Sequence, residues 1–149
     1  MERLDHLRQL MREIGPLMQL GSVVELNDRP AWQIEIDEAV GVEAVYDPDA
    51  ETLALIAVAG MPPQLPAGTV CERLLAYNAD WPGNGRPRAG LRGVLLSLAE
   101  DSPVLGLSAA GLAGMLGELD SAMRALIADL ERDTAATAIP GDAGLATRV

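Results

Sequence analysis

The sequence predicts an α+β protein in which a twisted, mainly antiparallel sheet is flanked by helices, in the order helix, three strands, helix, two strands, helix. Two kinds of hydrophobic periodicity support this prediction. Near both ends of the chain, apolar residues recur at three- and four-residue steps, which is typical of amphipathic helices. In the middle the period changes to two, which is typical of half-buried strands. Strands that follow one another through short turns favour an antiparallel sheet.

The first helix is predicted between Leu4 and Met18. Its apolar residues share one face, and charged and amide residues occupy the others. Gly15 and Pro16 are expected to break or kink this helix, because proline cannot donate a backbone hydrogen bond. The apolar face consists of Leu4, Leu7, Met11, Ile14 and Met18.

Three strands are expected next. Residues 32–37 alternate between apolar and polar side chains, and the alternation continues over 40–46 in a second strand. The third strand, 53–59, is apolar at every position, so we expect it to be covered on both faces. Residues 23–26 indicate a weaker strand or a strand extension. The apolar side chains of the first strand are Trp32, Ile34 and Ile36.

The second half of the chain is expected to contain a helix, two strands and a last helix. The capping-box sequence at 69–72 predicts the start of a helix over 70–80. Two strands are expected over 88–92 and 94–98, and Ser108 is the predicted N-cap of the last helix. The last helix carries an apolar stripe of Leu112, Met115, Leu116, Leu119, Met123, Leu126, Ile127 and Leu130.

The chain length of 149 residues suggests a single domain, which we predict over residues 1–132. Residues 133–149 show no apolar periodicity, and we expect them to form a flexible tail.

Charge and cysteine content exclude several classes of protein. The net charge of −11 argues against nucleic acid or an anionic membrane as a partner, because both require basic patches. The longest uncharged run, 102–117, is too short to insert across a bilayer. A single cysteine, Cys71, cannot form an internal disulfide, and the mixed charges of the first residues do not fit a signal peptide. We therefore expect a soluble intracellular protein.

The sequence offers few groups for catalysis. His6 is its only histidine and lies off the apolar face of the first helix, so no Ser/His/Asp or Cys/His arrangement is credible. The carboxylates of 47–51 lack the glycine and terminal glutamate of a calcium loop and are read as a turn. We expect no enzyme activity, no cofactor and no metal. The surplus of apolar strand residues favours a protein partner instead.

Four stretches carry a resemblance to a known family: 31–38, 51–63, 71–83 and 89–103. Together with the order of elements, they resemble the class I type III secretion chaperones, the Tir-chaperone family, over about residues 1–132. This resemblance implies a homodimer in the bacterial cytoplasm that binds the N-terminal segment of a secreted effector and keeps it competent for export. It implies no cofactor, and it adds a secretion ATPase or a regulator as further candidate partners.

The resemblance also implies two sets of site residues. Regions that hold the effector in the family match Leu4, Leu7, Met11, Trp32, Ile34 and Ile36. The region that pairs across the dimer axis matches Cys71, Leu74, Leu75, Asn78 and Leu91.

Two other functions stay open from the sequence. The first is a regulatory, partner-switching protein of the same fold, which sequesters a regulator of secretion genes. The second is a small-molecule-binding domain or an enzyme, which would need convergent polar groups in a pocket. The regulator would use the same apolar surfaces as an export chaperone, so the sequence alone does not separate these two.

Overall fold

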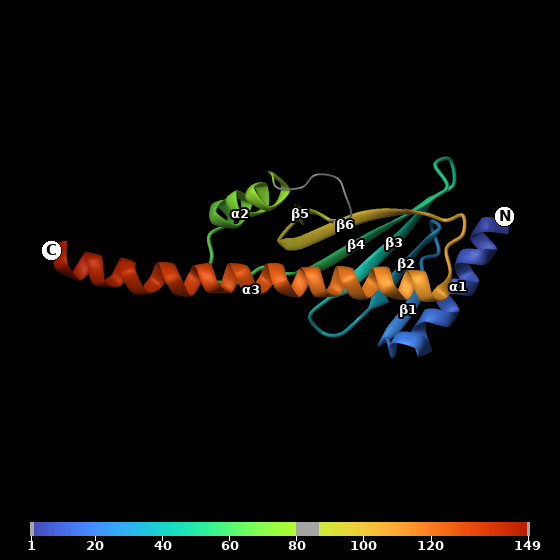
Figure 1. Ribbon diagram of the computed structural model, residues 1–149, viewed down its shortest axis with the longest axis horizontal. Helices are drawn as coiled ribbons and strands as arrows, with labels where there is room; N and C mark the ends of the chain where they lie inside the picture. Colours follow the sequence, from blue (N-terminus) through green and yellow to red (C-terminus); the bar gives the residue numbers. More distant parts are fainter. Residues whose placement is uncertain (1, 80–86, 149) are drawn as a thin grey trace.

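The computed structural model describes residues 2–148 except for 80–86, and it describes side chains as far as residue 132. Figure 1 shows the arrangement, a sheet with α3 running along it. The predicted fold class is confirmed. The elements are α1 (Glu2–Met18), β1 (Ser22–Glu25), β2 (Ala31–Glu35), β3 (Gly41–Asp47), β4 (Thr52–Gly60), α2 (Ala67–Ala79), β5 (Arg88–Arg92), β6 (Leu95–Pro103) and α3 (Ala109–Arg148).

The sheet is antiparallel throughout, with the strand order β1-β2-β3-β4-β6-β5. The weak strand signal at 23–26 corresponds to a paired strand, β1, in which Val23 lies opposite Ile34. β1 and β5 stand at the two ends of the strand order, so each has a neighbouring strand on one side only.

The core lies between one face of the sheet and the helices α1 and α3. The register places Trp32 opposite Ala44 and Ala44 opposite Leu55, and all three side chains are buried. Alternation along the strands sends these residues toward the helices. The buried helix residues that meet them include Leu7, Leu10, Met11 and Ile14 of α1 and Leu112, Leu116, Leu119 and Met123 of α3.

The other face of β4 remains partly exposed. Leu53, Leu55 and Ala57 are buried, whereas the intervening Ile56 and Val58 are only half-buried. The prediction that β4 is covered on both faces is therefore wrong, because α3, the helix that packs along it, lies on one side.

The structure differs from the sequence prediction near the C-terminal end of α1 and at the start of α2. α1 continues through Pro16 to Met18, because a proline in the last turn removes only one hydrogen bond. The positive φ of Gln19, 56°, then ends the helix. α2 begins at Ala67, and the Val70 N–H bonds to the Pro66 carbonyl at 3.2 Å, so Thr69 lies inside the helix. The predicted N-cap of α3 is confirmed, since Ser108 Oγ accepts the Gly111 N–H at 3.0 Å.

α3 continues as a helix to Arg148, where no regular structure was predicted. A helix satisfies its backbone groups within itself and needs no apolar stripe, and alanine, frequent over 135–138, has the highest helix propensity. The domain boundary at 132 and the flexibility of 133–149 stay predictions. No helix in the described part of the chain is both long and apolar enough to cross a membrane.

Candidate protein-binding surfaces

A groove lies between α1 and β1, at the end of the sheet where β1 has no further strand beside it. Its volume is about 340 Å³. Met11 and Trp32, both buried core residues, form part of its lining, so its floor belongs to the rigid core of the molecule. The remaining lining residues are Arg8, Arg12, Gly15, Leu20, Ser22, Val23 and Glu25.

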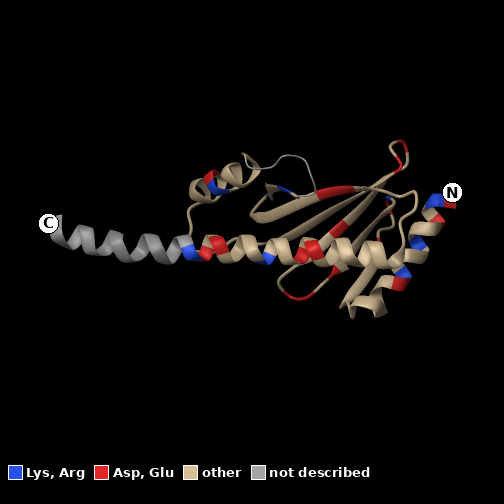
Figure 2. Cartoon of the chain, in the orientation of Figure 1, with Lys and Arg blue, Asp and Glu red and all other residues tan. Residues whose placement is uncertain are grey.

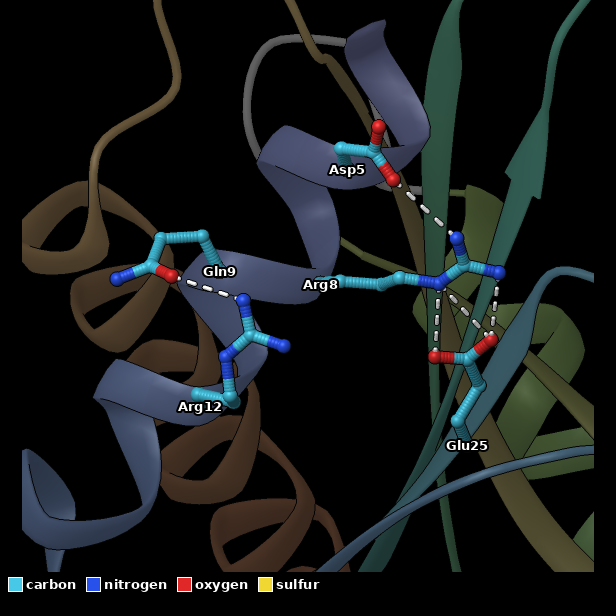
Figure 3. A network of polar contacts seen from close by, with 5 residues as sticks. All are labelled: Asp5, Arg8, Gln9, Arg12 and Glu25. Atoms are coloured by element: carbon cyan, nitrogen blue, oxygen red, sulfur yellow. Dashed lines mark hydrogen bonds and ion pairs between the residues drawn. The ribbon is translucent and has the colours of Figure 1, made fainter. Parts of the chain in front are cut away.

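A polar network joins α1 to β1 at one side of this groove (Figure 3). Arg8 Nε donates to both carboxylate oxygens of Glu25 at 3.1 Å, and Nη2 donates to Glu25 Oε2 at 3.1 Å. Arg8 Nη1 also reaches Asp5 at 3.3 Å. The hydrogen bond with Glu25 raises the pKa of Arg8 above its ordinary value, so the guanidinium stays charged. Arg8 thereby fixes the position of β1 relative to α1.

Arg12 lies one turn further along α1 and has a different partner. Its Nη2 donates to Gln9 Oε1 at 2.9 Å, and Gln9 Nε2 in turn donates to Glu13 at 2.8 Å. Figure 2 shows the basic residues that lie along α1. The groove is therefore bordered by two guanidiniums in a protein whose net charge is strongly negative.

Two large apolar side chains are exposed near this end of the molecule. Val24 of β1 is 53% exposed and Leu17 of α1 is 58% exposed. Exposed aliphatic residues beside an unpaired strand are typical of a surface that receives another chain. The strand signal in the sequence is weak at this edge, because four residues of strand are too few to show alternation.

The six residues matched to effector binding divide into three groups in the structure. Leu7 and Ile34 are core side chains with 0% and 2% exposure. Met11 and Trp32 are equally buried but line the groove. Leu4 and Ile36 pack against the core and are partly exposed. Four of the six side chains are therefore buried and support the surface from below. Contact of the six residues with an effector stays a prediction.

The uncovered face of the sheet holds a second groove, of about 350 Å³. Val24 and Val58 line it together with Glu43 and Arg92. Glu43, with its side chain only 15% exposed, lies 3.4 Å from Arg29 and 3.8 Å from Arg92. These contacts link β3 to the β1–β2 turn and to β5 across this face.

A third surface is formed by α2 and the neighbouring β5. Asn78 attaches the two elements: its Nδ2 donates to the Ala89 carbonyl at 2.7 Å, and its Oδ1 accepts the Ala89 N–H at 2.8 Å. Leu74 is 4% exposed, whereas Leu75 is 69% exposed, and Cys71 is exposed as well.

Leu91 of β5 is partly buried against the core. The structure therefore brings all five residues of the predicted dimer region to one end of the molecule. Two of them, Cys71 and Leu75, present exposed side chains. Sequence reasoning missed Val94, 75% exposed in the β5–β6 turn, because a single apolar residue in a turn carries no periodic signal.

In the described part of the chain, two carboxylates with shifted pKa values, Asp37 and Glu100, are not among the residues that line these grooves. The pKa of Asp37 is lowered by the backbone N–H of Ala39, by Arg124 and by the N–H of Val40. Burial raises the pKa of Glu100, and the nearby carboxylate of Glu118 raises it further. Among the described residues, no group of three or more histidines, cysteines and acids could hold a metal ion. The surfaces themselves, with apolar floors and charged borders, are suited to binding another polypeptide.

No protein-family model matches the sequence, and a search of curated proteins finds no match. Solved structures do match. A chain of the HopA1–SchA chaperone–effector complex is 20% identical, with a TM-score of 0.62, covering 85% of this chain and 95% of that one. A chain of the ExsC–ExsE complex is 21% identical, with a TM-score of 0.66, covering 79% and 89%.

A third match is the Yersinia pestis type III secretion chaperone SycH in complex with a fragment of YscM2. It is 21% identical, with a TM-score of 0.56, and the match covers 78% of this chain and 96% of that chain. These matches agree in the order of helices and strands as well as in nearly full coverage. The chain has the fold of the type III secretion chaperones.

Proposed function

We propose that this protein is a homodimeric chaperone of type III secretion in the bacterial cytoplasm, which binds the N-terminal segment of an effector and keeps it competent for export. The observation that supports this most is the groove between α1 and β1, because an unpaired strand edge stands directly beside an apolar floor. The similar structures include a chaperone–effector complex, which agrees with a polypeptide as the ligand.

Binding would begin with the backbone. An extended segment can add to β1 through main-chain hydrogen bonds, and its alternate side chains then point into the groove. An apolar side chain that buries ~100 Å² contributes roughly 2 to 3 kcal/mol at about 25 cal/mol per Å². Exposed ion pairs contribute less than about 1 kcal/mol each, so apolar contacts supply most of the affinity.

The second copy of the chain would bind at α2 and β5. Leu75 and Cys71 lie one helical turn apart on α2 and are exposed, and Val94 is exposed in the turn after β5. A closed two-fold pair is the commonest way for a protein to cover such a surface. This arrangement leaves the α1–β1 groove, at the other end of the sheet, free for the effector (Figure 1).

The proposal is tested by capturing the tagged protein from its bacterium, identifying the bound protein, and titrating that protein's isolated N-terminal segment by calorimetry. We expect a secreted protein whose segment is disordered when free and binds with a large negative heat-capacity change. A folded domain as the ligand would contradict the chaperone function. A partner that is never secreted would favour the regulatory alternative.

A further inference from the structure

Arg8 and Arg12 lie four residues apart on α1, so both guanidiniums border the same side of the α1–β1 groove. Glu25 and Asp5 both pair with Arg8. Arg12, by contrast, donates to the neutral amide of Gln9 (Figure 3). Like charges at this spacing destabilise a helix slightly. Acids balance the charge of Arg8, whereas among the described residues the polar contact of Arg12 is to an amide.

Several other arginines in the described part of the chain pair with acidic side chains. Each of Arg3, Arg29, Arg88, Arg92, Arg124 and Arg132 forms an ion pair with a carboxylate. With 22 acidic and 11 basic residues, carboxylates are abundant. Arg12 therefore differs from these arginines in its partner, and it does so at the border of a groove beside an unpaired strand.

We propose that Arg12 is a specificity-determining residue that receives the carboxylate of an aspartate or glutamate in the bound effector segment. This inference rests on the proposed function. A segment added to β1 directs alternate side chains into the groove, where the groove-lining residues Val23 and Glu25 lie. An acidic side chain at that position replaces the Gln9 amide as the acceptor for Arg12. A basic side chain there meets the Arg12 guanidinium, because the acids Asp5 and Glu25 already pair with Arg8.

The charge of the whole protein makes this contact selective. A net charge of −11 repels acidic segments in general, so a carboxylate in the segment is favoured where it meets Arg12 directly. A bidentate guanidinium–carboxylate contact is also directional. The acid consequently sets the register of the segment along β1, while apolar side chains supply most of the binding energy.

The test uses three short blocked peptides of alternating valine and threonine that differ only in a central glutamate, glutamine or lysine. Each peptide is titrated into the isotope-labelled protein, and the backbone amide signals of residues 22–25 report binding at β1. We expect the glutamate peptide to bind about fivefold more tightly than the glutamine peptide, as for a single exposed ion pair, and the lysine peptide to bind most weakly. High salt should remove the difference between glutamate and glutamine peptides.

Two variants show whether Arg12 is the cause. Arg12→Gln should bind the glutamate and glutamine peptides equally, and Arg12→Lys should keep part of the preference. Arg132→Gln, the matched control on the exposed surface of α3, should bind as the unmodified protein does. Equal binding of all three peptides at residues 22–25 would overturn the role of Arg12 and leave strand addition intact. Binding of none, or signals that change elsewhere, would overturn strand addition at β1 as well.

Discussion

At the scale of single residues, several polar contacts in the described part of this protein join one element to another. Asn78 is the clearest case, because one side chain satisfies both backbone groups of Ala89. The ion pairs of Arg8 and Arg29 do the same for β1 and for the β1–β2 turn. These roles could not be predicted from the sequence, since the partner of a single polar side chain on another element leaves no periodic signature.

Replacing Asn78 with alanine should destabilise the protein by about 1 to 3 kcal/mol, because the partly buried N–H and carbonyl of Ala89 lose their partners. Asn78→Asp keeps the acceptor and loses the donor, so its effect should be intermediate. Urea denaturation measures both, with Asn27→Ala in the exposed β1–β2 turn as the control. Equal stability of Asn78→Ala and the control would show that the bonds to Ala89 do not hold α2 against β5.

Glu100 should make stability depend on pH. Its pKa is raised in the folded state by burial and by Glu118, so the ionised form is disfavoured in the fold at neutral pH. Lowering the pH through the folded pKa protonates Glu100 and removes this destabilisation. Glu100→Gln should therefore raise the melting temperature at neutral pH, and the difference should vanish at a pH well below the ordinary pKa of glutamate. Thermal denaturation across that range checks this, and a pH-independent difference would contradict it.

At the scale of elements, periodicity predicted the positions of α1, α2 and the longer strands, but not the continuation of α3 to Arg148. The sequences of β2 and β3 alternate in register with the core, whereas β4 alternates in burial but is apolar throughout, so its sequence did not show which face is covered. Exposure was harder to predict: Leu74 and Leu75 are neighbours of the same type, yet one is 4% and the other 69% exposed. The difference depends on how α2 lies against β5, which a local pattern does not contain.

Leu75→Asp should yield folded monomers. The side chain is 69% exposed, so the charge does not disturb the core, but it would be buried without a partner in the proposed dimer. Light scattering at micromolar concentration measures the oligomeric state. Leu17→Asp, with a similarly exposed leucine at the opposite end of the sheet, is the matched control and should stay dimeric. A monomeric unmodified protein would refute the dimer.

Val24→Asp should weaken binding of the effector segment about tenfold, through loss of one apolar contact beside the unpaired edge of β1. Stability should change little, because Val24 is 53% exposed. Calorimetric titration with the captured effector's N-terminal segment measures the affinity. Leu105→Asp, 73% exposed in the loop before α3, serves as the control. Equal loss in both variants would point to charge rather than to the site.

At the scale of the whole molecule, the protein separates two proposed interfaces by the width of its sheet. β1 and its groove form one end of the strand order, and β5 with α2 forms the other. One hydrophobic core, between the sheet and the helices α1 and α3, connects them. Such a division lets a dimer form without covering the surface that would take up the effector.

Truncation after Arg132 should leave the melting temperature and the oligomeric state nearly unchanged, since the apolar periodicity of the sequence ends at Leu130. Thermal denaturation and light scattering of the truncated chain test this. A large drop in melting temperature would show that residues 133–149 belong to the folded domain.

Amide hydrogen exchange tests the central claim, that an effector segment adds to the free edge of β1, most directly. The protein is compared alone and with the N-terminal segment of its captured partner. The account predicts new protection of the amides of Ser22–Glu25 together with protection of the segment itself, which is unprotected when free. Protection confined to α2 and β5, or a segment that stays unprotected when bound, would contradict the account.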